Sequence, residues 1–282
     1  MITPTADLVR SAATAGVGLA AFNVVTLEHA EAIVRGAEQA ERPVILQISE
    51  NTVLFHQGQL APVAAASLAL ARAASVPVAL HLDHVTDVDL LRQAPECGFS
   101  SVMFDASTLE YAENVAATAA AADFCHAHGL WLEGELGAVG GKGGAHAPGV
   151  RTRPDEAVAF ARDTRVDLLA VAVGSSHAMT DRSARLDHEL IGELRSAVPV
   201  PLVLHGSSGV PDLELAAGIT AGLVKINIGT ALNIAYTAGV RSVLDSDPKA
   251  VDPRKALKAA RSAMADAVTA ALLVLAPEGS HV

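Results

Sequence analysis

The sequence is organised around eight short apolar segments, rich in Val, Ile and Leu, that recur along the chain. Each segment ends in polar residues or glycine and is followed by an alanine-rich stretch with helical periodicity, which predicts eight βα units. Strands this apolar are typical of a parallel sheet whose outer side is covered by helices, and eight such units close into a barrel. The predicted strands cover residues 18–23, 43–49, 77–84, 101–107, 131–137, 168–174, 201–206 and 223–229.

One barrel of this kind accounts for the whole chain of 282 residues, because single (β/α)8 domains fall in this size range. No change in composition marks a linker, so we predict one α/β TIM-barrel domain spanning residues 1–282. The segment from Asp247 onward is expected to form a turn and then one extra C-terminal helix over residues 253–275. Between the strands, the helical pattern is clearest over residues 28–40, 61–74, 111–128, 154–163 and 188–197.

The net charge of −11 argues against two classes of partner. General nucleic-acid and anionic-membrane binders need basic stripes that neutralise phosphates, so neither partner is expected. Cys97 and Cys125 lack the spacing of metal ligands and are predicted to be free thiols in a reducing compartment. The N-terminal segment has no signal-peptide pattern and no apolar run reaches about 18 residues, which predicts a soluble cytoplasmic protein.

Polar residues mark the carboxyl end of nearly every predicted strand, which is the face where barrel active sites are built. Any one of them is explained equally well as a strand-end cap. Together they predict a ring of functional side chains around the barrel mouth. The residues are Asn23, Ser49, Asp83, His84, Asp105, Ser107, Glu135, His177, His205 and Asn227.

Three histidines in this ring, His84, His177 and His205, predict a catalytic zinc site. Neutral imidazoles are good Zn²⁺ ligands, and three of them leave one position open for a substrate. Asp83 directly precedes His84, and because strand residues alternate between faces, one of the two is expected to lie just past the strand end. His81 shares a strand face with Asp83, where it either supports the ligands from behind or packs in the interior.

These motifs resemble those of the class II (zinc-dependent) fructose-bisphosphate and tagatose-bisphosphate aldolases over nearly the whole chain. The matching segments include PVALHLDH, GFSSVMFDAS, LAVAVGSSH, LVLHGSSG and KINIGTAL. The order of HLDH, a distant GSSH and then HGSSG is highly specific, and the chain length resembles that of the shorter, tagatose-type branch.

The resemblance implies a reversible lyase that splits a phosphorylated ketose, a ketose 1,6-bisphosphate, into dihydroxyacetone phosphate and an aldehyde through a metal-stabilised enediolate. It implies that His84, His177 and His205 hold Zn²⁺, and that Asp83 is the acid/base that handles the C4 hydroxyl or aldehyde proton. Asp105 and Glu135 would supply an alternative metal position or support the ligands, with simple strand-end caps as the other interpretation. A requirement for Na⁺ or K⁺ stays open.

The resemblance also implies a sugar-phosphate site and an assembly, a homodimer or a homotetramer. Backbone N–H groups freed by glycine at a helix start form an anion cradle without net positive charge. Arg254 would reach the far phosphate, across a subunit boundary, unless it is only an exposed arginine at a helix start. The other implied substrate and phosphate contacts are Asn23, Ser49, Gly206, Ser208, Asn227, Gly229 and Thr230.

Several positions depart from the family pattern. Val85, Ala106 and Ala178 stand where glycine is usual, and are expected to add methyl groups near the substrate pocket. The loop over residues 140–149 lacks the usual acidic pair, so His146 either replaces it in proton transfer or is a solvated loop residue. Three alternatives therefore remain: an aldolase for a different modified ketose phosphate, a catalytically silent paralogue that binds a sugar phosphate, and a metal-dependent hydrolase on a similar barrel.

Overall fold

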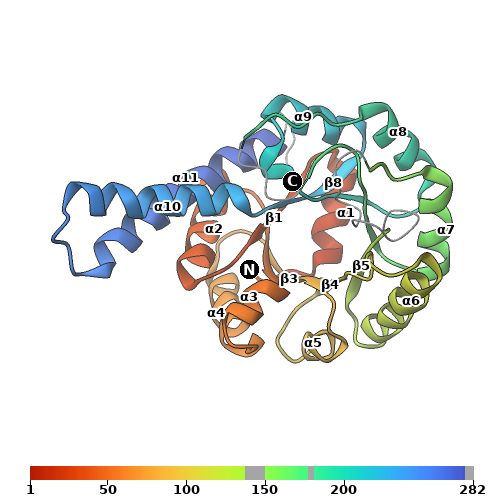
Figure 1. Ribbon diagram of the computed structural model, residues 1–282, viewed down its shortest axis with the longest axis horizontal. Coiled ribbons are helices and arrows are strands. Elements are labelled where there is room, and N and C mark those ends of the chain that lie inside the picture. The colour runs from red at the N-terminus through yellow and green to blue at the C-terminus, as the bar shows by residue number, and fades with distance from the viewer. Residues whose placement is uncertain (137–149, 177–180, 277–282) are drawn as a thin grey trace.

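The computed structural model describes residues 1–136, 150–176 and 181–276, and within them eight parallel strands close into a barrel (Figure 1). Each strand pairs with its neighbours in chain order, and β8 pairs with β1. The predicted (β/α)8 TIM barrel is therefore confirmed. The strands are β1 (Leu19–Asn23), β2 (Val44–Ser49), β3 (Val78–Val85), β4 (Ser101–Phe104), β5 (Trp131–Glu135), β6 (Leu168–Ala170), β7 (Leu202–Leu204) and β8 (Leu223–Ile228).

Five strands, β4 to β8, end earlier than predicted, and β4 and β6 do so by the largest margin. β4 ends at Phe104 and β6 at Ala170, whereas the apolar pattern extended to residues 107 and 174. Beyond β6 the backbone turns to other partners: Thr152 donates its N–H to the carbonyl of Ala172, and Asp187 donates to that of Val173. The apolar residues that follow β6 are thus buried by loops and do not continue the sheet.

Helices cover the outside of the barrel between successive strands (Figure 1). A further helix, α1 (Thr5–Ala15), lies at the amino end of the barrel, where Ile2 forms a bridge with Val78 at the start of β3. The 3₁₀ turn η1 covers Ser207–Gly209. The outer helices are α2 (Leu27–Ala40), α3 (Glu50–Phe55), α4 (Leu60–Ala73), α5 (Val88–Gln93), α6 (Tyr111–Ala127), α7 (Pro154–Thr164), α8 (His188–Ala197) and α9 (Asp212–Ala221).

Alternation along the strands separates two apolar clusters. Leu46 and Leu80 face outward and pack with helix residues such as Ile33. Leu19 and Met103 belong to the second cluster, which fills the barrel interior together with α1. The amino-end half of the interior is therefore apolar and plugged, and the inward polar residues gather towards the carboxyl end.

The chain ends in a pair of long helices, α10 (Thr230–Ser246) and α11 (Pro253–Leu275), which we call the arm. The predicted extra helix over residues 253–275 is confirmed as α11. Part of the arm projects beyond the barrel in Figure 1, while α11 also packs against α2. Gly239 allows the two arm helices to approach closely, because a Cβ there would lie 2.6 Å from the Ala260 Cα.

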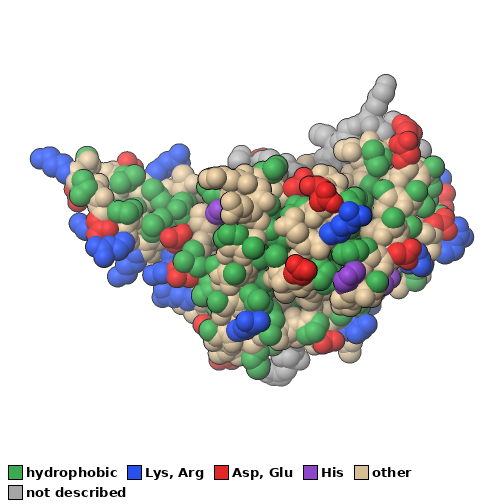
Figure 2. Space-filling view, turned by 90° about the horizontal axis from the view of Figure 1, so that it is seen from below, with side chains coloured by type: hydrophobic (Ala, Val, Ile, Leu, Met, Phe, Trp, Pro, Cys, Tyr) green, Lys and Arg blue, Asp and Glu red, His purple; other side chains and the backbone are tan. Residues whose placement is uncertain are grey.

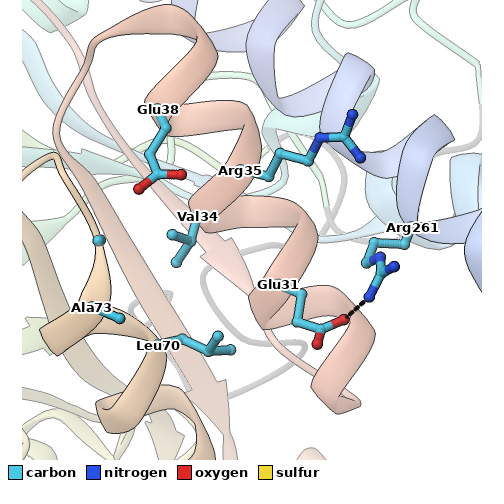
Figure 3. A pocket seen from close by; sticks show the side chains of 8 residues that line it. Glu31, Val34, Arg35, Glu38, Leu70, Ala73 and Arg261 are labelled. Atoms are coloured by element: carbon cyan, nitrogen blue, oxygen red, sulfur yellow. Dashed lines mark hydrogen bonds and ion pairs between the residues drawn. The ribbon is translucent and has the colours of Figure 1, made fainter.

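A groove of about 410 Å³ lies outside the barrel between α2, α4 and α11 (Figure 3). Two of its acids are satisfied within the helix layer: Glu31 pairs with Arg261, and Glu38 accepts hydrogen bonds from the Ser75 N–H and hydroxyl. We therefore interpret it as a packing groove. No helix in the described part of the chain is both long and apolar enough to cross a bilayer.

The close contact within the arm is testable. Gly239→Ala should lower the free energy of unfolding by about 1–3 kcal/mol, because the new methyl group meets Ala260 backbone atoms that cannot move independently. The matched control is Gly192→Ala in α8, where a Cβ meets nothing within 4 Å. That change should leave stability equal or raise it by about 0.5–1 kcal/mol. Urea unfolding of the two variants measures both effects, and equal stability of the two would contradict the packing interpretation.

Candidate metal centre

The site begins with an irregularity in β3. Between the paired positions Leu82↔Val102 and Val85↔Phe104, β3 advances three residues while β4 advances two, so β3 carries one extra residue. His84 lies in this bulge with a φ of 48°, in the left-handed region. The expectation that Asp83 or His84 must lie past the strand end is therefore wrong: both lie within β3, and the bulge brings both side chains to the barrel mouth.

His84 and His205 meet at this mouth. The Nε2 of His84 lies 3.1 Å from the Nδ1 of His205, and the rings meet edge to face. Asp83, His84 and His205 each offer a ligand atom, and these atoms lie within 4.8 Å of one another. Two imidazoles and a carboxylate form a donor set that suits Zn²⁺. The third predicted ligand, His177, lies outside the described residues.

A second potential ligand group shares His84. In this group His84, Asp105 and Glu135 each offer one ligand atom, and these three atoms also lie within 4.8 Å of one another. Asp105 Oδ2 lies 3.0 Å from the His84 Nδ1, and its Oδ1 accepts hydrogen bonds from the Ser107 N–H and hydroxyl. Asp105 is thus more than a strand-end cap, because one of its oxygens orients His84. The two overlapping groups are compatible with the predicted alternative metal position.

The carboxylates control the charge of His84. Burial alone would lower the pKa of His84, but the surrounding carboxylates, Asp83 first, outweigh it and raise that pKa to about 10. Burial likewise opposes ionisation of Asp105, yet its contacts with His84 and Ser107 outweigh burial and lower the pKa of that carboxyl. Without a metal ion, His84 is therefore an imidazolium held among carboxylates. A divalent cation can take the place of its proton.

Asp83 is held by amides from two neighbouring strands. Its Oδ2 accepts a hydrogen bond from Gln47 Nε2 at 3.1 Å and from Asn23 Nδ2 at 3.5 Å. Its Oδ1 makes no hydrogen bond with the described residues, and the Nε2 of His81 lies 3.9 Å away. Burial raises the pKa of Asp83, with His84 opposing it. An oriented, buried carboxylate with one oxygen available fits both a cation and a proton-transfer role.

A buried polar layer, most of which was not predicted from the sequence, lies beneath these residues. Gln47, Glu133 and Lys225 are all at most 1% exposed. Each lies two residues before a predicted site residue, so strand alternation places it on the same inward face, one level deeper. That spacing was the available signal. His81 also belongs to this layer: it bonds Ser101 through Nδ1 at 2.7 Å, and its Nε2 lies 3.9 Å from Asp83 Oδ1.

The predicted anion cradle is assembled from two loops that are joined by hydrogen bonds. Gly206 has a φ of 67° and precedes η1, while Gly229 is the N-cap of α10. The Ser207 hydroxyl donates to the carbonyl of Asn227, and Ser208 Oγ accepts from the N–H of Ala231. Thr230 begins α10, so the N-terminus of a 17-residue helix opens beside Gly206. Four of the predicted phosphate contacts, Gly206, Ser208, Gly229 and Thr230, are thus brought together, whereas the Asn227 side chain contacts Lys225 and His205.

Other predicted contacts divide into two groups. Asn23 bonds Asp83 at the mouth, and Ser49 pairs with Asp83 across β2 and β3 while capping α3. Arg254 is not brought to this mouth by its own chain. It lies in the first turn of α11, pairs with Asp252, and its side chain is 87% exposed.

The far end of the arm carries Lys and Arg side chains (Figure 2), among them the exposed Lys249, Arg254 and Lys255. The same turn also carries Asp247 and Asp252, which pair with Lys255 and Arg254, so the far end of the arm is mixed in charge. Arg254 therefore lies on the exposed far end of the arm, which projects beyond its own barrel (Figure 1). Any phosphate contact by Arg254 would have to be made outside its own barrel mouth.

Val85 and Ala106 were expected to add methyl groups near the substrate pocket, but neither does so. Both are buried in the apolar cluster between the sheet and the outer helices. Their extra methyl groups therefore pack behind the barrel wall. Ala178, His146 and the loop over residues 140–149 lie outside the described residues.

Comparisons with known proteins place the chain in a family and match its fold. A family model described as fructose-bisphosphate aldolase class-II matches residues 3–280. The YdjI aldolase of Escherichia coli K12 is 29% identical, with 100% of both chains covered and a TM-score of 0.87. A Coccidioides immitis protein, provisionally assigned as a fructose-1,6-biphosphate aldolase, is 28% identical over 98% of this chain and 96% of its own, with a TM-score of 0.84. The fructose-bisphosphate aldolase of Campylobacter jejuni, 22% identical over 99% and 97%, shares the fold with a TM-score of 0.81.

The raised pKa of His84 predicts that metal binding is linked to pH. In chelator-treated protein, Zn²⁺ must displace a proton from His84, so its apparent affinity should rise by up to about tenfold per pH unit between about pH 7 and 9. The same shift stabilises the metal-free fold fully below about pH 6.5, and that contribution is lost as the pH rises towards 10. Calorimetry in two buffers of different ionisation enthalpy measures the released proton.

Asp105→Asn should reduce this proton release, because it removes a carboxylate that favours the charged ring. Asp167→Asn is the matched control, since Asp167 also contacts a histidine, His126 at 2.9 Å, but lies before β6 at the amino end of the barrel. Binding of Zn²⁺ without proton release at pH 7–8 would show that His84 is already neutral.

Proposed function

The chain belongs to the class II fructose-bisphosphate aldolase family, and we propose that it is a metal-dependent lyase that reversibly cleaves a phosphorylated ketose to dihydroxyacetone phosphate and an aldehyde. The observation that carries this proposal is the convergence of His84, His205 and Asp83 at the barrel mouth. A general sugar-phosphate binder needs a cradle for anions but has no need of a buried acid/base beside a metal-binding group.

The proposed metal is Zn²⁺, held by His84, His205 and His177. The role of His177 rests on the sequence alone. Imidazole nitrogens favour Zn²⁺ over the hard cations Mg²⁺ and Ca²⁺. When bound, the ion would act as a Lewis acid that stabilises the enediolate left by cleavage of the C3–C4 bond. Asp105 and Glu135 offer the alternative position, and Asp105 also keeps the His84 ring in place.

Asp83 is proposed as the catalytic acid/base. Gln47 and Asn23 hold its Oδ2, which leaves Oδ1 to take the C4 hydroxyl proton in cleavage and to return it in condensation. Burial raises the pKa of this carboxyl, and that makes it a stronger base than an exposed aspartate. A different group must exchange the proton on the enediolate carbon, and His146 stays a candidate for that role.

The phosphate of the dihydroxyacetone moiety is proposed to lie at the start of α10. Gly206, Ser208, Gly229 and Thr230 surround this N-terminus, whose exposed N–H groups and helix dipole favour an anion. Ser208 accepts a bond from Ala231 and keeps its own hydroxyl hydrogen to donate. Such a cradle explains how a chain with a net charge of −11 can bind a phosphate.

A ketose 1,6-bisphosphate is the preferred substrate. Its second phosphate would meet Arg254 of another subunit, an arrangement supported by the exposure of that side chain away from its own barrel. The lack of a carboxylate over residues 140–149 favours, as the alternative, an aldolase for a different modified ketose phosphate. The homodimer or homotetramer, a monovalent cation and the cytoplasmic location stay predictions.

Asp83→Asn tests the proposed function. Cleavage of fructose or tagatose bisphosphate, and the reverse condensation, should fall by about 10²–10⁴-fold, because an amide cannot take the C4 hydroxyl proton. Exchange of the dihydroxyacetone phosphate C–H proton with deuterated water should persist, since that step does not involve the C4 oxygen. The measurements are coupled cleavage assays, proton NMR of the exchange and metal analysis.

The wild-type chain with and without a chelator is the control for these assays. Bound zinc with exchange supports the aldolase. Zinc without exchange, or turnover of Asp83→Asn at the wild-type rate, would contradict the proposal and favour the silent or hydrolytic alternative.

A further inference from the structure

A fully buried ion pair lies directly beneath the candidate metal centre. Lys225 Nζ lies 2.8 Å from Glu133 Oε2, and both side chains have 0% exposure. Burying two charges costs about as much as their attraction returns, so such a pair is weak evidence for stability. The other contacts of these two residues point towards the site above them.

Glu133 determines the state of His205. Its Oε1 lies 2.8 Å from the Nε2 of His205. A carboxylate only accepts hydrogen bonds, so Nε2 carries a hydrogen. The amide nitrogen of Asn227 lies 3.2 Å from Nδ1 and only donates, so Nδ1 presents its lone pair. Nδ1 is the nitrogen that lies 3.1 Å from the His84 Nε2, inside the ligand group. Glu133 thus selects the tautomer that offers a metal-binding nitrogen to the mouth.

Lys225 determines the direction of two amides. An ammonium group only donates, and its three contacts are Glu133 Oε2, Asn227 Oδ1 at 2.7 Å and Gln47 Oε1 at 3.4 Å. With the oxygen of Gln47 turned to Lys225, its Nε2 faces Asp83 Oδ2 at 3.1 Å. The reversed amide would place an oxygen against that carboxylate, which is repulsive.

We propose that Glu133 and Lys225 are positioning residues: Glu133 fixes His205 as an Nδ1 ligand, and Lys225 fixes both Glu133 and the amide that orients Asp83. The part of this inference that concerns Asp83 rests on the proposed function. The part that concerns His205 needs only that the site binds a divalent metal. The pair therefore acts on metal affinity and on turnover without touching substrate.

Glu133→Gln tests the first half. Lys225 would hold the one remaining oxygen of the new side chain, so its nitrogen would face His205 Nε2 and favour a hydrogen on Nδ1. Affinity for Zn²⁺ and Co²⁺, measured by chelator competition, should fall by about 10–100-fold, and the Co²⁺ absorption spectrum should change. Asp167→Asn, which alters a different histidine–carboxylate contact, should keep wild-type affinity and spectrum.

The double variant Lys225→Met with Glu133→Gln separates positioning from stability. Glu133→Gln alone leaves the Lys225 ammonium buried without its carboxylate, which destabilises the fold. The double variant leaves no buried ion unpaired, so its thermal stability should be near or above that of wild type. A positioning role predicts that metal affinity and kcat stay low in this stable variant, while KM changes little. Recovery of metal affinity and kcat together with stability would overturn the inference.

The wild-type protein provides a test that does not depend on any variant folding. Long-range ¹H–¹⁵N NMR of the metal-free protein, with His205 assigned by loss of its signals in His205→Gln, should show a hydrogen on Nε2 and none on Nδ1. A hydrogen on Nδ1 would overturn the proposal. So would wild-type metal affinity and Co²⁺ spectrum in Glu133→Gln.

The result that would contradict the proposed function differs from the results that would contradict the positioning role. If wild type binds zinc but neither cleaves a ketose phosphate nor exchanges dihydroxyacetone phosphate protons, the lyase assignment fails. The His205 tautomer and the metal affinity of Glu133→Gln still decide the positioning role.

Discussion

The candidate site depends on one extra residue in β3. Without the bulge, alternation would direct Asp83 inward and His84 outward, and the acid/base and the metal ligand could not share one mouth. The bulge places His84 at a φ of 48°, a conformation that costs a non-glycine residue about 1 kcal/mol or more. Contacts of His84 with Asp105 and His205 offset that cost. Backbone strain is thus located where two adjacent side chains must act together.

The barrel interior changes character along its axis, and this gradient gives the site its chemistry. Leu19 and Met103 fill the amino end with α1, so water is excluded from below. Above them Glu133 and Lys225 neutralise each other, and above those lie the histidines and carboxylates of the mouth. Each strand contributes to successive levels through residues two apart, so a rigid sheet sets the spacing between levels. The polar groups are held by the same strands that form the apolar core.

Much of this arrangement could be predicted from the sequence. The barrel, α11 and the meeting of His84 with His205 follow from apolar segments that end in polar residues, because the carboxyl ends of parallel strands meet at one mouth. The bulge could not be predicted, since a single extra residue leaves no periodic signal. Glu133 and Lys225 were missed because a charged residue inside an apolar strand is ordinarily unfavourable, and only its spacing from Glu135 or Asn227 indicates a role. The ends of β4 and β6 were overestimated because buried loops are as apolar as strands.

Charge balance explains why this mouth suits a cation. Four carboxylates lie in a small volume here, those of Asp83, Asp105, Glu133 and Glu135. Lys225 supplies one permanent positive charge, but it is already paired with Glu133. In the metal-free chain His84 compensates by holding a proton, which is why its pKa rises to about 10 despite burial. A divalent ion can replace that proton and carries one more positive charge, so it satisfies the same electrostatic demand better. The carboxylates that raise the pKa of His84 are therefore the same groups that attract a metal ion.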